Sequence, residues 1–243
     1  MPEGPSLVIL KEELKHFKKK TVTAASGTAA IDFDLLAGKP VTDLKTWGKH
    51  LLICFKDVTI RIHLLMFGTY RINEKKGLQP KLHLEFGKDE VNFYTCAVKQ
   101  IDVKLDDVYD WSADVMNKNW DPKNAKKKLK DKEGLMVCDA LLDQTIFSGV
   151  GNIIKNEVLY RIKVHPESQV AALPVKKVNE LVKEAVVYAF EFLEWKKNFT
   201  LKDHWLAHTK KMCKRCKLPL TKKYTGKTKR RSFFCEHCQP LYS

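Results

Sequence analysis

The chain has 243 residues, 44% of them hydrophobic and 30% charged, which excludes a wholly disordered chain and allows one large domain or two smaller ones. Its 44 Lys and Arg residues outnumber its 29 Asp and Glu residues, so the net charge is +15 and the isoelectric point is near 9.4. A surplus of this size most often serves to neutralise the phosphates of nucleic acid. No apolar run reaches the roughly 18 residues of a membrane span, and the start of the chain does not resemble a signal peptide. We therefore expect an intracellular protein that binds nucleic acid rather than a membrane.

The first predicted element is a helix from Ser6 to Phe17, directly behind the terminal sequence MPEGP. Its apolar residues recur at helical spacing, and Ser6 is a suitable cap. A chain terminus is usually frayed unless something holds it in place. The run of Pro, Glu, Gly and Pro before the helix raises the alternative that the terminus itself takes part in chemistry.

Residues 21–103 show the period of two that is typical of β-strands. The segment TIRIHLL separates apolar from polar side chains, with Ile60, Ile62 and Leu64 on one face and Thr59, Arg61 and His63 on the other. Further short runs, HLLICF, HLEF and VNFY, are separated by clusters of Gly, Asn, Asp and Lys. This arrangement predicts an antiparallel sandwich or barrel.

Helical periodicity follows in the second half of the chain. The basic stretch 121–134 marks a domain boundary, and we interpret it as a solvated helix face rather than as a specific DNA site. Two helices are then predicted, in LMVCDALLDQ and NIIKNEVLYRI, and a longer amphipathic helix begins at Pro174. The sequence thus predicts an α+β chain with three domains, residues 1–118, 119–205 and 206–243.

Four cysteines form two CxxC pairs with 18 residues between them, CKRC (Cys213, Cys216) and CEHC (Cys235, Cys238). Each pair offers two thiolates to one tetrahedral ion, so the pattern predicts a single structural Zn²⁺ in a β-hairpin ribbon. Redox pairs or chance surface thiols are the alternatives, but neither explains the paired spacing in an intracellular chain.

The predicted hairpin is also the most basic segment of the chain. Between Lys210 and Arg231 there are eleven Lys or Arg residues and no acidic residue. A purely structural ribbon does not need this charge, whereas a ribbon that grips phosphate does.

A glycine-rich turn, SGVGN, separates the first two helices of the second half. It places Gly149 and Gly151 in the turn and Asn152 at the start of the next helix. Free N–H groups at a helix start, with an Asn beside them, suit a phosphate group. An ordinary structural turn explains the same residues, so the motif by itself leaves both interpretations open.

Three features in this order resemble the formamidopyrimidine-DNA glycosylase and endonuclease VIII family: MPEG at the terminus, GVGNI(x3)EVLY between helices, and the basic CxxC…CxxC hairpin. The resemblance runs from Pro2 to Gln239. It implies an N-terminal antiparallel β-sandwich with a flanking helix, a helix–two-turns–helix domain and a zinc ribbon. It also implies a base-excision repair enzyme that removes a damaged base from double-stranded DNA and cleaves the strand at the abasic site. We expect such an enzyme to act as a monomer.

The resemblance also assigns catalytic roles. Removal of Met1 would expose Pro2 as a secondary amine, which forms an iminium with C1′ of the deoxyribose. An α-amino group has a pKa of about 8, so a neutral fraction exists near pH 7. Glu3 would be the neighbouring acid and base. Lys49 in WGKHLL matches the family's lysine on a β-strand, although by itself it would be interpreted as a surface residue.

The family's phosphate-clamping Arg lies five residues before the third zinc cysteine, which is Arg230 here. The adjacent Arg231 is the alternative. Further DNA contacts are implied at the start of the glycine-turn helix and on two strands of the first domain, at Asn152, Lys155, Lys81 and Lys99.

The segment HLLMFG resembles the loop that fills the space left by an extruded base. Leu65, Met66 and Phe67 are the candidate wedge residues. The alternative is the last core-facing turn of a strand, but three successive side chains cannot all face one side of a strand.

Two departures from the formamidopyrimidine branch narrow the subtype. AVKQ follows YTC where that branch carries Pro-Arg-Arg-Phe, and the link TLKDHWLAHTKKMC is short. Both favour the endonuclease VIII branch, oxidised pyrimidines and β,δ-elimination. An enzyme for oxidised purines and a non-catalytic lesion-binding protein remain alternatives, and the trio of Pro2, Glu3 and Lys49 argues against the latter.

Overall fold

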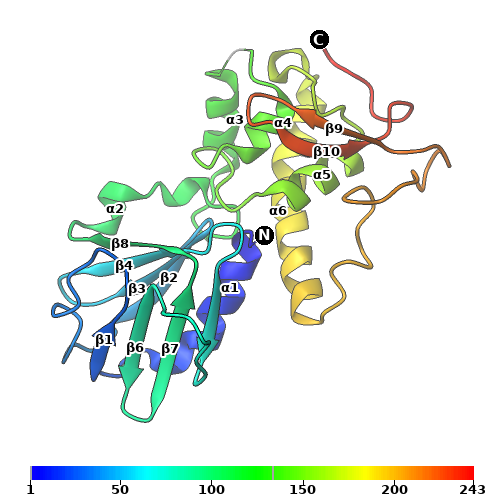
Figure 1. Cartoon of the computed structure of the whole chain (residues 1–243). Coiled ribbons are helices and arrows are strands. Elements are labelled where there is room, and N and C mark those ends of the chain that lie inside the picture. Colours follow the sequence, from blue (N-terminus) through cyan, green and yellow to red (C-terminus); the bar gives the residue numbers. More distant parts are fainter. Residues whose placement is uncertain (1, 133) are drawn as a thin grey trace. The chain divides into compact units, whose positions relative to one another are not determined.

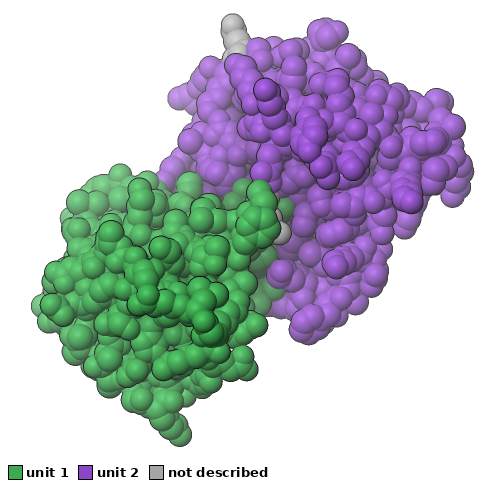
Figure 2. Space-filling view, viewed as in Figure 1, with its two compact units in different colours: residues 1–109 green, residues 110–243 purple. Residues whose placement is uncertain are grey.

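The computed structural model describes residues 2–132 and 134–243, and the chain divides into two compact units, residues 1–109 and 110–243 (Figures 1 and 2). Each unit has a hydrophobic core of its own. The sequence predicts three domains, with bounds after residues 118 and 205. The compact units do not test this division, so it stays a prediction.

Two four-stranded antiparallel sheets form most of the first unit (Figure 1). One has the order β2–β3–β4–β8, with strands at Asp43–Trp47, His50–Cys54, Thr59–His63 and Ala97–Ile101. The other has the order β1–β6–β7–β5, with strands at Ala24–Ser26, Leu82–Phe86, Asp89–Tyr94 and Thr69–Ile72. The predicted antiparallel fold of this half is confirmed.

Apolar side chains from both sheets pack into the core of the first unit. In β4, Ile60 and Ile62 are fully buried and Arg61 is partly exposed, as the alternation of the strand requires. Leu7 and Leu10 of the first helix join the same core, so the predicted flanking helix is a structural component of the sandwich.

The first helix, α1 (Gly4–Glu13), begins two residues before the predicted start and continues as the 3₁₀ turn η1 (Leu14–Phe17). Pro5 lies in the first turn, where its missing N–H costs no hydrogen bond. Glu3 rather than Ser6 is therefore the N-cap residue. A short helix, α2 (Leu105–Val108), lies near the end of the unit.

The second unit is mainly helical (Figure 1). Its helices and 3₁₀ turns are η2 (Trp111–Ala113), α3 (Pro122–Lys130), α4 (Val137–Leu142), α5 (Asn152–Arg161), η3 (Val170–Ala172) and α6 (Val175–Lys197). Asp121 caps α3 by accepting a hydrogen bond from the backbone N–H of Lys123 at 2.8 Å. Only Ala125 and Leu129 of α3 are buried, which fits the predicted solvated helix.

Helices α3 to α6 surround the core of the second unit, in which α5 and α6 contribute Ile154, Val158, Leu181 and Phe192. The chain then forms an antiparallel hairpin of β9 (Thr221–Thr225) and β10 (Arg230–Phe234). A small apolar cluster around the ribbon cysteines packs against Tyr160 of α5. Among the described residues, no helix is long and apolar enough to cross a membrane.

We predict that Phe93→Ala destabilises the first unit by about 3–5 kcal/mol, because Phe93 is fully buried and its truncation leaves a cavity. The matched control is Phe67→Ala in the same unit, where the ring is 75% exposed. That control should change the free energy of unfolding by less than about 0.5 kcal/mol. Urea unfolding followed at amide resonances of β6 and β7 measures both, and equal effects of the two variants would contradict the assignment of the core.

Candidate functional site

The start of the chain is anchored by α1. Pro2 directly precedes Glu3, which is the N-cap of that helix and is fully buried. The backbone carbonyl of Glu3 accepts a hydrogen bond from the N–H of Ser6 at 2.8 Å. A carboxyl group withdrawn from solvent is suited to acid–base chemistry. The predicted removal of Met1 lies outside the described residues.

Lys49 occupies the turn of a β-hairpin and not a strand position, which corrects the expectation from sequence. Trp47 and His50 are paired residues of β2 and β3, so Gly48 and Lys49 form a two-residue turn between them. Gly48 has a φ of 53°, which a Gly at the first turn position adopts without steric cost. The turn holds the partly buried Lys49 at the end of a rigid hairpin.

Two histidines lie beside this lysine. The rings of His50 and His63 meet edge to face, with their centroids 5.3 Å apart. Burial, followed by the charges of Arg61, His63 and Lys49, lowers the pKa of His50 to about 3. Burial, Lys49 and Arg61 also lower the pKa of His63. Both rings are therefore neutral near pH 7, and the positive charge of this region belongs to Lys49 and Arg61.

The predicted wedge residues lie together on an exposed turn after β4. Leu65, Met66 and Phe67 are 46%, 48% and 75% exposed, so the alternative of a core-facing turn is excluded. The N–H of Gly68 donates to the carbonyl of Leu64 at 2.7 Å and closes the turn. A Cβ on Gly68 would lie 2.1 Å from that carbonyl oxygen, so only glycine fits there. Three adjacent apolar side chains in solvent are an unusual surface feature that points to a contact partner.

Lys81 and Lys99 are both exposed, and they lie at different sheets of the first unit. Lys81 lies immediately before β6 rather than within a strand. Lys99 lies in β8 and is the cross-strand partner of Arg61 in β4. Two like charges directly opposite each other destabilise a sheet, and a polyanion placed over them would remove that cost. The position of Lys99 therefore fits a phosphate contact better than that of Lys81 does.

Polar side chains on one face of helix α5 form hydrogen bonds with the backbone of strand β10. The carbonyl of Arg231 accepts hydrogen bonds from the side-chain amide of Asn152 at 3.0 Å and from that of Asn156 at 3.4 Å. The side-chain carbonyl of Asn156 accepts from the N–H of Phe233 at 3.2 Å. Asn152 is the first residue of α5, as predicted, and its amide binds the ribbon strand in this structure.

Lys155 has a different environment from the one that a phosphate contact requires. Its side chain is fully buried, and its ammonium group donates to the hydroxyl of Ser232 at 2.8 Å and to the carbonyl of Arg231 at 3.3 Å. A buried ammonium group is stable only when such acceptors replace water. This placement disfavours the predicted direct contact with DNA and assigns Lys155 to the positioning of β10.

Arg231 itself points to solvent. Its guanidinium group donates to the hydroxyl of Tyr224 at 2.7 Å and lies 5.2 Å from the centre of that ring. Arg230, the first residue of β10, is partly buried. The two candidates for the phosphate clamp thus lie on a strand whose backbone is fixed by α5, and Arg231 is the more exposed.

The tip of the hairpin is held by Asp139 of α4, a residue that no sequence motif singles out. The carboxylate is 5% exposed and accepts hydrogen bonds from the N–H groups of Lys227 at 2.8 Å and Thr228 at 3.1 Å. The Thr228 hydroxyl donates to it at 2.9 Å. A Cβ on Gly226 would lie 2.4 Å from both carboxylate oxygens. An Asp in an apolar helix sequence is a signal of such a role, but the sequence does not reveal the partner.

The four ribbon cysteines come together, as predicted: their sulfur atoms lie within 4.8 Å of one another. The sulfur atoms of Cys213 and Cys238 are 3.8 Å apart. A tetrahedral ion with Zn–S bonds of about 2.3 Å requires sulfur–sulfur distances of about 3.8 Å, so the geometry fits Zn²⁺. Burial opposes the ionisation of Cys213, but hydrogen bonds from Tyr160 and the backbone outweigh it and lower its pKa to about 6. The remaining cysteines of the chain, Cys54, Cys96 and Cys138, are buried elsewhere.

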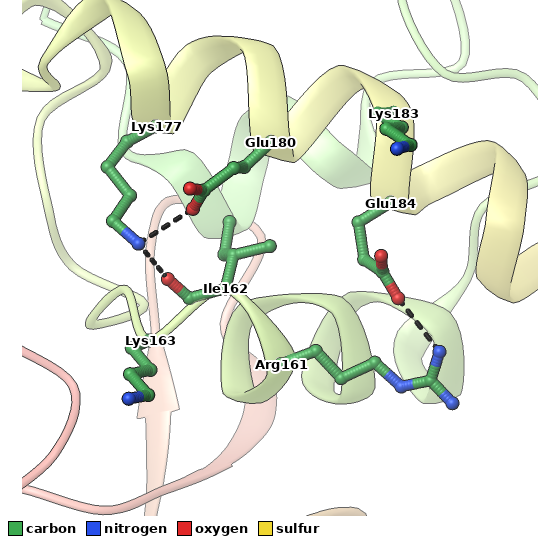
Figure 3. A pocket seen from close by; sticks show the side chains of 7 residues that line it. All are labelled: Arg161, Ile162, Lys163, Lys177, Glu180, Lys183 and Glu184. Atoms are coloured by element: carbon green, nitrogen blue, oxygen red, sulfur yellow. Dashed lines mark hydrogen bonds and ion pairs between the residues drawn. The ribbon is translucent and has the colours of Figure 1, made fainter.

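A pocket of about 390 Å³ lies between the end of α5 and the start of α6 (Figure 3). Its acidic side chains are already paired, Glu184 with Arg161 at 2.8 Å and Glu180 with Lys177 at 2.7 Å. Lys177 also donates to the carbonyl of Ile162 at 2.5 Å. Among the described residues that line this pocket, none belongs to the predicted site, so we assign no catalytic role to it.

Comparison with known proteins gives two family matches. Residues 1–107 match the formamidopyrimidine-DNA glycosylase N-terminal domain, and residues 112–200 match the formamidopyrimidine-DNA glycosylase H2TH domain. The matches follow each other in this order and lie within the first and the second unit, respectively.

Curated relatives include endonuclease 8-like 3 of Xenopus laevis, 31% identical over 94% of this chain, and that of Homo sapiens, 28% identical over 97%. The alignments cover 39% and 42% of those proteins, so the chain spans about two fifths of their length. A solved structure of Lactococcus lactis formamidopyrimidine-DNA glycosylase bound to DNA with an abasic site has a TM-score of 0.86. It is 21% identical, and the alignment covers 98% of this chain and 99% of that one, which demonstrates the shared fold.

We predict that Asp139→Ala lowers the stability of the second unit by about 1–3 kcal/mol, because two backbone N–H groups of the hairpin tip lose their buried acceptor. Asp203→Ala, at an exposed position of the same unit, is the matched control and should be neutral. Hydrogen exchange at the amides of Lys227 and Thr228 should accelerate only in the first variant. Unchanged exchange at these amides would contradict the proposed role of Asp139.

We predict that His50 weakens the first unit in acid. Its folded pKa of about 3 lies below the ordinary value of 6.5, so the unfolded state binds the proton first as the pH falls. Stability should therefore decrease between about pH 6.5 and about pH 3, and His50→Gln should reduce this decrease. Titration of the ring by NMR and urea unfolding at amide resonances of β3 measure the two effects. His16→Gln, at an exposed ring, is the control, and an NMR pKa near 6.5 for His50 would refute the prediction.

Proposed function

We propose that this chain, which belongs to the formamidopyrimidine-DNA glycosylase and endonuclease VIII family, removes oxidised bases from DNA and cleaves the strand at the resulting abasic site. The observation that carries the proposal is the occurrence of both family domains, in order, behind an N-terminal Pro-Glu pair held at the start of α1. Proteins similar to these domains include an endonuclease 8-like 3 and a formamidopyrimidine-DNA glycosylase, and the Pro-Glu pair is proposed to supply the reacting groups.

Pro2 is the proposed nucleophile once Met1 has been removed. Its ring nitrogen attacks C1′ of the damaged nucleotide, the bond from C1′ to the base breaks, and the base leaves with its electron pair. The nitrogen then loses its proton, the bond from C1′ to the ring oxygen breaks, and the nitrogen lone pair forms an iminium ion with C1′, which is positively charged at any pH. This charge withdraws electrons, so loss of a proton from C2′ expels the 3′ phosphate. A second elimination expels the 5′ phosphate and completes the β,δ sequence.

Glu3 is the proposed proton carrier. Its buried carboxyl group precedes the first turn of α1, one residue after the nucleophile. Protonation of the sugar ring oxygen allows the bond from C1′ to that oxygen to break, so that the amine already bound to C1′ forms the iminium ion. The same group, once ionised, accepts a proton in a later step.

Lys49 and Arg230 are proposed to bind the phosphates that flank the damaged nucleotide, and Arg231 is an alternative clamp. Lys49 sits on a rigid hairpin turn beside two neutral histidines. Because both histidine rings are neutral near pH 7, they do not compete with Lys49 for a phosphate group. Asn152 and the exposed Lys81 and Lys99 are proposed as further contacts.

The exposed turn of Leu65, Met66 and Phe67 is proposed to enter the base stack. Apolar side chains in the space of an extruded base restore some of the lost stacking and kink the duplex. The zinc ribbon is proposed to hold one structural Zn²⁺ through its four cysteines, which positions the arginine strand.

Oxidised pyrimidines are the proposed substrates. The segment AVKQ after YTC and the short link before the ribbon support the endonuclease VIII branch. An enzyme for oxidised purines and a lesion-binding protein without catalysis are the rival functions. We further propose that the active form is an intracellular monomer.

The test is borohydride trapping with duplexes that carry thymine glycol, dihydrouracil, 8-oxoguanine or an abasic site. Covalent complexes should form with the abasic duplex and with both pyrimidine lesions, faster than with 8-oxoguanine. Glu3→Gln should reduce base removal by at least about tenfold while DNA binding persists, since general acid–base catalysis contributes about 10²–10⁴-fold. Mass spectrometry of the trapped species should place the adduct on Pro2, with Met1 missing.

Each rival function has its own outcome in this experiment. Preferential trapping on 8-oxoguanine would support the purine enzyme. DNA binding without trapping on any duplex, in protein shown by mass spectrometry to begin at Pro2, would support the lesion-binding protein and refute the enzymatic proposal.

A further inference from the structure

The zinc cysteines have hydrogen-bond partners that the ligand pattern alone does not reveal. The hydroxyl of Tyr160, near the end of α5, lies 3.2 Å from the sulfur of Cys213. Tyr160 is 2% exposed, so water does not compete for this hydroxyl. A cysteine that binds a metal ion is a thiolate and has no proton to give. The phenol must therefore be the donor in the metal-bound state.

A second donor reaches another cysteine of the same cluster. The Nε of Arg215 lies 3.3 Å from the sulfur of Cys238. Its guanidinium carbon lies 3.8 Å from the centre of the Tyr160 ring. The ring therefore holds the guanidinium group in place while its hydroxyl group faces Cys213. Tyr160 and Arg215 thus form one unit that contacts two of the four sulfur atoms.

The charge of the site explains why such donors matter. One Zn²⁺ with four thiolates carries a net charge of −2, and Cys213 is fully buried. Hydrogen bonds and a cation beside the sulfur atoms lower the cost of holding that charge away from water. Partners behind metal ligands commonly change metal affinity by about 10–100-fold when they are removed.

We propose that Tyr160 and Arg215 are positioning residues that strengthen zinc binding and attach the zinc cluster to helix α5. Arg215 lies within the CKRC knuckle, whereas Tyr160 belongs to the glycine-turn helix. The same helix binds β10 through Asn152 and Asn156. Helix α5 therefore contacts both the zinc cluster and the strand that carries the candidate phosphate clamp. This inference rests on the zinc site of the proposed function but not on its enzymatic activity.

The experiment measures zinc affinity in the full chain by competition with a chromophoric chelator. Tyr160→Phe keeps the ring under Arg215 and removes only the hydroxyl, and it should weaken binding by about tenfold or more. Arg215→Met removes the cation and should have an effect of similar size. The double variant should lose less than the product of the two single effects, because the two side chains are in contact.

Matched controls separate this role from a general effect on the ribbon. Tyr224→Phe makes the same chemical change on β9, where the ring is exposed and its hydroxyl faces Arg231. Lys214→Met removes a positive charge from the exposed residue next to Arg215. Both controls should leave zinc affinity unchanged.

Spectroscopy and stability supply readouts that a purely structural role would not move. In the Co²⁺-substituted protein, Tyr160→Phe should shift the sulfur-to-cobalt charge-transfer band, because the Cys213 thiolate loses a donor. It should also lower the melting temperature of the zinc-bound protein more than that of the chelator-treated protein. An equal loss in both states, with an unmoved band, would refute the inference.

The outcomes also distinguish this inference from the zinc site itself. Folded wild-type protein that binds no zinc would refute the proposed metal site. One equivalent of zinc in the wild type, with unchanged affinity in Tyr160→Phe and Arg215→Met, would refute the positioning role alone.

Discussion

The buried carboxylate of Glu157 is the interaction on which the second unit depends. It accepts hydrogen bonds from three successive backbone N–H groups, those of Leu206, Ala207 and His208, at 2.7–2.9 Å. Burial raises the pKa of this carboxyl group, while the three donors favour its charged form. The bonds fix the segment that leads from α6 to the first zinc cysteine. Glu157 therefore fixes the start of the segment that leads into the ribbon relative to α5.

Other polar side chains along α5 also position the ribbon. Asn152 and Asn156 bind β10, Lys155 binds Ser232, and Tyr160 reaches the cysteine cluster. Each of these groups would be costly inside the protein without its partner, so together they require one arrangement of ribbon and helix. Arg231, by contrast, has its backbone held and its side chain exposed. A rigid backbone with an exposed cationic side chain is well suited to a fixed polyanion.

The helices and strands could be predicted from the sequence, because the spacing of hydrophobic residues differs between a helix and a strand. The alternation in β4, the long helix after Pro174 and the paired cysteines were all recognisable from residue types and spacing. The errors of the sequence-based predictions concern single residues. Lys49 lies in a turn because the register of β2 and β3 determines where the hairpin reverses, and register depends on pairing across the sheet. Lys155 is buried because β10, far away in sequence, covers it.

The sequence by itself determined the family, the fold class and the types of side chain available for chemistry. Motif order, the number of cysteines and an uneven charge are properties of the linear chain and need no contact to be recognised. Only the tertiary structure decided which polar residues are structural and which are exposed. Lys155 and Arg231 are both basic and both belong to predicted motifs, yet one is buried and the other faces solvent. Burial and hydrogen-bond partners come from segments distant in sequence, so no local pattern distinguishes the two.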